Sequence, residues 1–277
     1  MNSMNKRLII LAFGFMLLLN IPSAQATMLD LTTIDADGWI GDAYFLQINP
    51  QSTGTGVIDS FVEIGDARQS TDEFDVAYAD VVEAYNTTVN GTFDNGSSDN
   101  FNHELLFSLV PSVELDDGEF YRQFLLDVNQ NSGLGDTARY ISLDEIQVFL
   151  SSDPNQDVES FDGDGIVELE DSELLYWMDE EEDSWVKLDY ELNAGSGSGD
   201  MFLYLPEELF EEFYGDDPDN EEFQYVYIYS RFGENFTNND GFEEWAVQKD
   251  IVPEPTTISL LGLGLLGLVG SRKRKRS

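Results

Sequence analysis

Residues 103–128 read HELLFSLVPSVELDDGEFYRQFLLDV, two apolar runs joined by Asp116-Asp117-Gly118. An Asp-Gly pair accepts the positive φ angles of a tight turn, so the sequence predicts a β-hairpin with strands at residues 103–115 and 119–128. Similar aromatic and β-branched runs recur along the chain. They predict further strands at residues 44–48, 57–64, 145–150, 174–178, 185–192, 201–205, 223–232 and 242–247.

Asp-Gly and Asn-Gly pairs separate these runs, and each pair is expected to mark a turn. They are Asp37-Gly38, Asn90-Gly91, Asn95-Gly96, Asp117-Gly118, Asp162-Gly163 and Asp240-Gly241. Residues 195–199 (GSGSG) predict a flexible hairpin loop. Residues 206–214 begin with Pro and acidic residues and predict a short helix. Many short strands with regular turns indicate an all-β domain of the β-sandwich or jelly-roll type.

The first 26 residues have the parts of a secretory signal peptide. Lys6 and Arg7 form a positive start, residues 8–19 form an apolar signal helix, and Ala24-Gln25-Ala26 matches the pattern that signal peptidase cleaves. The apolar run is short for a membrane-spanning helix, which needs about 20 residues. We therefore expect cleavage after Ala26 and export of residues 27–251 as one acidic domain.

Residues 252–277 combine three features in order. Pro253-Glu254-Pro255 comes first, followed by an uncharged apolar segment at 258–269, which predicts a single transmembrane helix. A basic cluster then predicts a stop-transfer element that stays on the cytoplasmic side. This cluster consists of Arg272, Lys273, Arg274, Lys275 and Arg276.

This order of features resembles the PEP-CTERM sorting signal of Gram-negative bacteria, although a plain single-span anchor would also contain an apolar segment and basic residues. The resemblance implies that Pro253, Glu254 and Pro255 are recognised by exosortase, a membrane transpeptidase-like enzyme associated with exopolysaccharide production. It also implies transient anchoring in the inner membrane, followed by residence at the cell surface or in the extracellular matrix. The two prolines keep the motif extended, which suits a peptide that enters a processing enzyme.

The exported part is strongly acidic. Between residues 27 and 251 there are 54 acidic and six basic residues, a net charge of −48. Repulsion of this size excludes nucleic acid and anionic lipid as partners. Bound divalent cations, a saline environment or a solubilising surface would each account for it. The chain has no cysteine, so disulfides and thiol catalysis are excluded.

The sequence does not identify a catalytic residue. His103 is the only histidine, and no Gly-x-Ser-x-Gly motif accompanies it, so a Ser-His-Asp triad is not expected. A glycoside hydrolase needs a pair of carboxylates, but the chain has too many carboxylates to single out one pair. We therefore expect a protein that is not an enzyme.

Two acidic turns are candidate calcium sites, because hard cations prefer closely spaced carboxylate and amide oxygens. Neither turn completes an EF-hand pattern, since the first has Ala138 at its twelfth position and the second lacks a fifth-position ligand. The alternative is an Asx-rich turn that satisfies its own backbone. The candidate ligands are Asp127, Asn129 and Asn131 in the first turn, and Asp162, Asp164 and Glu168 in the second. No other cofactor is expected.

Aromatic residues are candidate sugar contacts. They are Trp39, Trp177, Trp185 and Trp245, together with Tyr225, Tyr227 and Tyr229 on one side of a strand. Val226 and Ile228 on the other side are also apolar, which favours a buried strand. The sequence therefore predicts a structural or binding role at the cell surface or in an exopolysaccharide matrix. The alternatives are a calcium-dependent carbohydrate-binding module and a secreted glycoside hydrolase.

Overall fold

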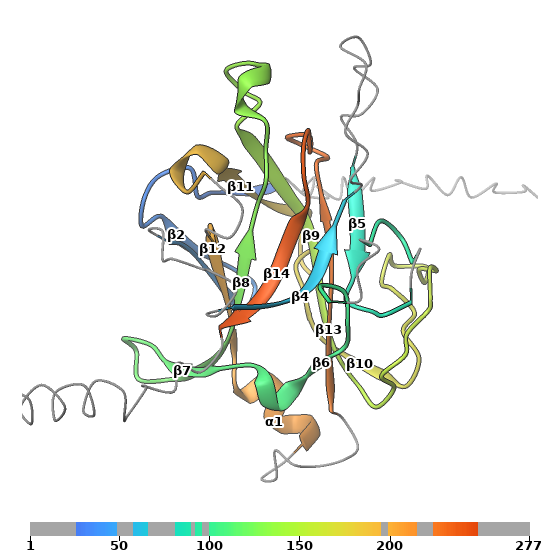
Figure 1. Cartoon of the computed structure of the whole chain (residues 1–277). Helices are drawn as coiled ribbons and strands as arrows, with labels where there is room; N and C mark the ends of the chain where they lie inside the picture. The colour runs from blue at the N-terminus through green and yellow to red at the C-terminus, as the bar shows by residue number, and fades with distance from the viewer. Residues whose placement is uncertain are drawn as a thin grey trace, which may run out of the picture.

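The computed structural model describes residues 26–48, 58–65, 81–89, 92–95, 100–194, 199–214 and 224–248. They form two seven-stranded sheets whose inner faces enclose a common core (Figure 1). The prediction of an all-β sandwich is therefore confirmed. The predicted signal helix and transmembrane helix lie outside the described residues.

The first sheet is built around the long central strand β9 (Tyr140–Ser151). Its order is β1 (Thr27–Asp30), β11 (Ser184–Asp189), β9, β13 (Tyr225–Phe232) and β5 (Val82–Tyr85). In addition, β10 (Ser172–Trp177) pairs with β9, and β6 (Leu105–Leu106) pairs with β13. The β1–β11 pair is parallel, and the other pairs are antiparallel.

The second sheet has the order β2 (Asp37–Ile40), β3 (Ala43–Gln47), β12 (Met201–Pro206), β8 (Phe120–Asp127), β14 (Glu243–Gln248) and β4 (Ile58–Ile64). The short strand β7 (Ser112–Glu114) pairs with β8. The helix α1 (Glu208–Tyr214) follows β12 at one end of the sandwich (Figure 1), as the sequence predicts.

The hairpin predicted for residues 103–128 is confirmed in its second half. Ser112 lies opposite Arg122 in the β7–β8 pair, and Gly118 has the positive φ, +85°, that the turn requires. The prediction of one strand over residues 103–115 is wrong. The chain leaves β6 through a short 3₁₀ turn (Phe107–Leu109) and passes Pro111, which has no backbone N–H to donate to a sheet.

Two other turn predictions are wrong. The Asp37-Gly38 pair lies inside β2, where a side chain at Gly38 would come within 2.5 Å of Leu29 Cδ1 and would require Leu29 to move. The turn instead falls at Gly41, with a φ of +55°. The strands on either side of residues 195–199, β11 and β12, belong to different sheets and so do not form the expected hairpin, while residues 195–198 themselves lie outside the described part of the chain.

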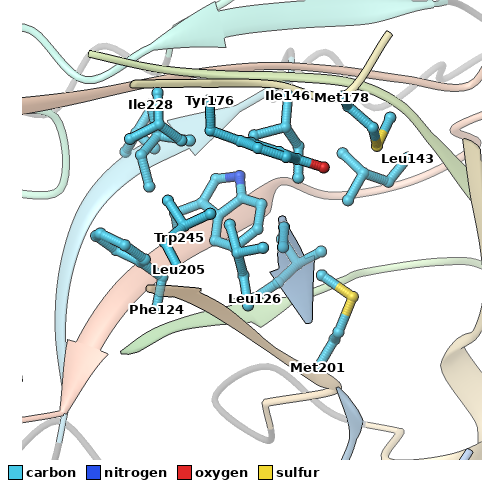
Figure 2. Packing of buried hydrophobic residues seen from close by; sticks show 14 of the residues in the cluster. Phe124, Leu126, Leu143, Ile146, Tyr176, Met178, Met201, Leu205, Ile228 and Trp245 are labelled. Atoms are coloured by element: carbon cyan, nitrogen blue, oxygen red, sulfur yellow. The ribbon is translucent and has the colours of Figure 1, made fainter. Parts of the chain in front are cut away.

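Trp245 links the two sheets across the core. It belongs to β14 in the second sheet and is fully buried. Its Nε1 donates a 2.9 Å hydrogen bond to Ser230 Oγ of β13 in the first sheet. Figure 2 shows its ring among apolar side chains from both sheets, with Leu126 and Ile228 among them. A sugar contact at Trp245 is therefore excluded.

The tyrosines of β13 are buried too. The outer face of the first sheet carries a second apolar cluster that includes Tyr227 and Tyr229, both fully buried. Val167 and Leu169 pack in the same cluster. The interpretation of this strand as one buried on both faces is confirmed for Tyr227 and Tyr229, and Tyr225 is partly buried beside them.

Candidate functional site

An aromatic row crosses the outer face of the second sheet. We use this name for Trp39, Tyr44 and Tyr204, which lie opposite one another on β2, β3 and β12. Gln123 of β8 continues the row and donates a 3.0 Å hydrogen bond from Nε2 to the Tyr204 hydroxyl. Because side chains alternate along a strand, their neighbours point into the core. These neighbours are Ile40, Phe45 and Leu203.

The rings of the row are in contact, and their exposure falls from the sheet edge inwards. The Trp39 and Tyr44 ring centroids are 5.0 Å apart at an interplanar angle of 35°, and those of Tyr44 and Tyr204 are 5.9 Å apart at 29°. Trp39 is 51% exposed, Tyr44 is partly buried and Tyr204 is 5% exposed. The edge strand β2 therefore presents an indole to solvent on a rigid aromatic support.

Carboxylates border the aromatic row. Asp37, which is exposed on β2, interacts with the Tyr44 hydroxyl. Tyr121, whose ring lies 6.2 Å from Trp39, donates a 2.8 Å hydrogen bond to Asp117 Oδ2. This bond, together with burial, raises the pKa of Tyr121 to about 12. Both hydroxyls therefore stay protonated at neutral pH, beside carboxylates that accept hydrogen bonds.

The remaining tryptophans lie elsewhere. Trp177 and Trp185 are partly buried on strands of the first sheet. The Trp185 ring packs 5.9 Å from the ring of Phe236. Among the four tryptophans, Trp39 alone is exposed, although the sequence does not distinguish them.

A second feature is the acidic cluster, formed by Asp127, Asp200 and Glu243. Asp127 ends β8, Asp200 precedes β12 and Glu243 begins β14, and their exposed fractions are 3%, 3% and 0%. Adjacent backbone amides hold two of the carboxylates. Val128 N donates to Asp200 Oδ2 and Asn129 N donates to Glu243 Oε2, each over 2.8 Å.

Burial dominates the electrostatics of the acidic cluster. It raises the pKa of both Asp200 and Glu243 well above the ordinary range. The negative charge of Asp127 raises both values further, and that of Asp200 raises the pKa of Glu243. In the described part of the chain, neither Asp200 nor Glu243 forms an ion pair with a lysine or arginine. Both carboxyls are therefore buried without a cationic partner among the described residues, and the raised pKa favours the protonated form of each.

The acidic cluster contains only one residue of the first predicted calcium turn, Asp127. Asn131 accepts a hydrogen bond from Gly133 N at Oδ1, and its own N–H donates to Asn239 Oδ1 over 2.7 Å. Asn131 therefore forms an Asx turn, and Asn129 contributes its backbone N–H to Glu243. The sequence missed Asp200 and Glu243, because they come close to Asp127 only through the pairing of β8 with β12 and β14.

The second predicted calcium turn satisfies its own backbone. Asp162 Oδ1 accepts 2.9 Å hydrogen bonds from the N–H groups of Asp164 and Ile166, which lower the pKa of Asp162. Glu168 accepts a 3.0 Å hydrogen bond from Ser160 Oγ. Within the described ranges, no three His, Cys, Asp or Glu side chains are already arranged to hold a metal ion.

Glu145 and Asp179 form a separate pair of hydrogen-bonded carboxyls on the first sheet. Burial, followed by the negative charge of Asp179, raises the pKa of Glu145 from 4.5 to about 8, and burial also raises the pKa of Asp179. Arg231 and Gln147 oppose the shift of Glu145. The folded state thus keeps a proton on Glu145 that the unfolded chain releases. Its contribution to stability is complete below pH 4.5 and is lost as the pH rises towards 8.

We therefore expect Glu145→Gln, which is neutral at every pH, to weaken the pH dependence of stability. At pH 9 the variant should be more stable than the wild type by on the order of 2 kcal/mol, and at pH 4 the two should be nearly equal. Urea unfolding at both pH values measures this difference. Glu180→Gln removes a charge from an exposed residue nearby and serves as the control. Equal pH profiles for Glu145→Gln and the wild type would contradict the assignment of the proton.

His103 lies in the segment before β6. Its ring is partly buried, and Nδ1 lies 2.8 Å from the carbonyl oxygen of Glu104. One of the two ring nitrogens of His103 therefore contacts the backbone of the neighbouring residue.

A shallow pocket of about 440 Å³ opens between residues 134–138 and 235–239. The side-chain amides that line the pocket form hydrogen bonds within the protein. Asn239 Nδ2 donates to Ala138 O over 2.7 Å, and Asn235 Nδ2 donates to Asp144 Oδ1 over 2.9 Å. We therefore regard the pocket as a product of loop packing.

The predicted sorting residues are outside the described part of the chain. This holds for Pro253, Glu254 and Pro255, for the basic cluster at 272–276 and for Ala24, whereas Ala26 is exposed at the start of the described residues. Among the described helices, none combines the length and hydropathy needed to cross a membrane. The apolar segment at 258–269 lies outside the described residues.

Fold and composition thus define an acidic β-sandwich protein. Comparison with protein families adds that residues 252–275 match the PEP-CTERM protein-sorting motif. The chain therefore carries a PEP-CTERM sorting motif, which implies that it is exported, associated with the cell envelope and recognised by exosortase. Neither the curated proteins nor the solved structures contain a match to the chain.

Proposed function

We propose that the exported domain is a non-catalytic binding protein of the cell surface or exopolysaccharide matrix, and that its aromatic row binds a neutral polysaccharide. The observation that carries this proposal is Trp39. It is a half-exposed indole on an edge strand, and its ring packs against the ring of Tyr44.

The chemistry of the row suits a sugar. The C–H faces of a pyranose pack against an aromatic ring, and the hydroxyls at its rim form hydrogen bonds with nearby polar groups. Asp37 and Asp117 lie beside the row as acceptors for such hydroxyls. The end of the row at Trp39 is open to solvent on the edge strand β2, so a sugar unit of a polymer can reach the indole from the side of the sheet.

The charge of the domain supports a neutral ligand. A net charge of −48 between residues 27 and 251 repels an anionic polysaccharide. The sorting motif supports the setting, since exosortase recognition places the domain in the envelope. Cleavage by signal peptidase after Ala26, transient anchoring in the inner membrane of a Gram-negative cell and contact with exopolysaccharide are further parts of this proposal.

We expect Trp39→Ala to weaken binding of a neutral polysaccharide at least tenfold, because the stacked ring supplies most of the exposed apolar contact. Affinity electrophoresis of the full chain through gels that contain a neutral or an anionic polysaccharide measures the effect. Trp39→Phe should retain part of the binding.

Trp185→Ala is the matched control, because Trp185 is an aromatic residue of the other sheet, away from the row. Equal retardation of the wild type and Trp39→Ala would reject the site. Release of reducing sugar from the polysaccharide would reject the non-catalytic role and favour the glycoside hydrolase.

A further inference from the structure

The acidic cluster has carboxylate oxygens that the fold leaves without a bond. Asp200 and Glu243 each use one oxygen to accept a backbone N–H, from Val128 and Asn129 respectively. Asp200 Oδ1 and Glu243 Oε1 are buried and, within the described part of the chain, accept no hydrogen bond. A buried carboxylate without compensation costs several kcal/mol. Such a cost is unusual at two neighbouring sites in a stable core.

Buried amides beside the acidic cluster share this feature. Gln130 follows the two amides that hold the carboxylates, is 4% exposed, and has neither side-chain atom hydrogen-bonded within the described residues. Asn193 donates from Nδ2 to Gly199 O and Ile48 O, each over 2.8 Å, which places its amide next to Asp200. Its Oδ1 is buried and also lacks a hydrogen bond within those residues. The Asn193 amide thus lies close to the acidic cluster, and Gln130 adjoins it in sequence.

We propose that Asp127, Asp200 and Glu243 bind a structural divalent cation, calcium by its preference for oxygen, with amide oxygens of Gln130 and Asn193 completing the shell. Calcium takes six to eight oxygens in flexible geometry, which fits a mixture of carboxylates and amides. The carboxylates alone do not form a ready-made metal geometry. Binding therefore includes rotation of the carboxylate side chains towards the ion as well as rotation of the amides. This inference is independent of the polysaccharide proposal.

The cation would tie together the adjacent ends of three strands of the second sheet. Asp127 ends β8, Asp200 immediately precedes β12, and Glu243 begins β14. The backbone N–H of Asp200 donates a 2.7 Å hydrogen bond to Leu126 O of β8. A cation that binds these carboxyls only in the folded protein stabilises the folded state and leaves the unfolded chain unaffected. Stability therefore increases with the concentration of the cation.

The test uses the full chain at fixed ionic strength, with calcium chloride compared against sodium chloride and a chelator. We expect calcium to raise Tm by about 5–10 °C and to bind with a calorimetric stoichiometry that falls by one site in Asp200→Asn and in Glu243→Gln. In chelator both variants should be at least as stable as the wild type, because each replaces a buried carboxyl that is costly to ionise with a neutral amide. That combined result is not expected from a variant that merely damages the fold.

Asp162→Asn, in the exposed Asx turn, is the matched control and should keep the full calcium response. A calcium response that survives in Asp200→Asn and Glu243→Gln would overturn the proposal. So would the absence of calcium binding and of a Tm shift in the wild type, which would mean that the buried carboxyls are protonated instead.

Discussion

Trp245→Ala is expected to lower the free energy of unfolding by about 3–5 kcal/mol, the range for removal of a large buried aromatic side chain. The ring is fully buried and packs between both sheets (Figure 2). Its removal leaves a cavity at the centre of the sandwich. It also leaves the Ser230 hydroxyl without its 2.9 Å partner in a region away from water.

Urea unfolding followed by circular dichroism measures this loss. Trp245→Phe separates the effect of the cavity from that of the lost hydrogen bond, since phenylalanine fills much of the volume but cannot donate to Ser230 Oγ. We expect this variant to lose less than half as much stability as Trp245→Ala. Trp39→Ala is the control. Its indole is 51% exposed, so its change should stay within about 0.5 kcal/mol. A loss below about 1 kcal/mol for Trp245→Ala would contradict the role of this residue in the core.

Arg122→Met is expected to destabilise the protein by about 3–5 kcal/mol, because it breaks a largely buried ion pair. The Arg122 and Glu207 side chains are 12% and 16% exposed, and a terminal nitrogen of Arg122 contacts Glu207 Oε1. The guanidinium also donates to Val110 O over 2.7 Å and lies 4.1 Å from the Phe107 ring centroid.

This arrangement closes the end of the sandwich at α1. Phe107 stacks on Phe210 of α1, with ring centroids 5.2 Å apart, and the Arg122 guanidinium also packs against the Phe107 ring. The guanidinium therefore joins β8, the turn before β7 and the start of α1. Loss of this one side chain should loosen all three elements, which hydrogen exchange of the α1 amides would detect.

A double-mutant cycle with Glu207→Gln measures the pair itself. We expect Arg122→Met with Glu207→Gln to recover part of the stability that Arg122→Met loses, because the carboxylate charge is then also gone. Glu234→Gln provides the comparison at the surface. It breaks the more exposed Arg231–Glu234 pair of 3.2 Å and should cost no more than about 1 kcal/mol. Similar losses for the two pairs would contradict the importance of burial.

Local patterns were sufficient for the class of fold and for the sorting signal. The β7–β8 turn at Gly118, the strand of residues 201–205 and the helix that ends at Tyr214 are each encoded within a few neighbouring residues. The sorting motif at 252–275 is likewise a contiguous stretch. Turn chemistry, β propensity and short peptide motifs act over this range, so the sequence alone determines them.

The exposure of each aromatic residue and the makeup of the candidate sites were decided by the tertiary structure. Trp39 and Trp245 both lie in β-forming stretches, yet one is at a sheet edge and the other at the centre of the core. The aromatic row joins β2 and β3 to the distant strand β12. The acidic cluster likewise requires β8 to lie between β12 and β14. Strand order depends on how two sheets bury their apolar faces together, and no local pattern encodes that choice.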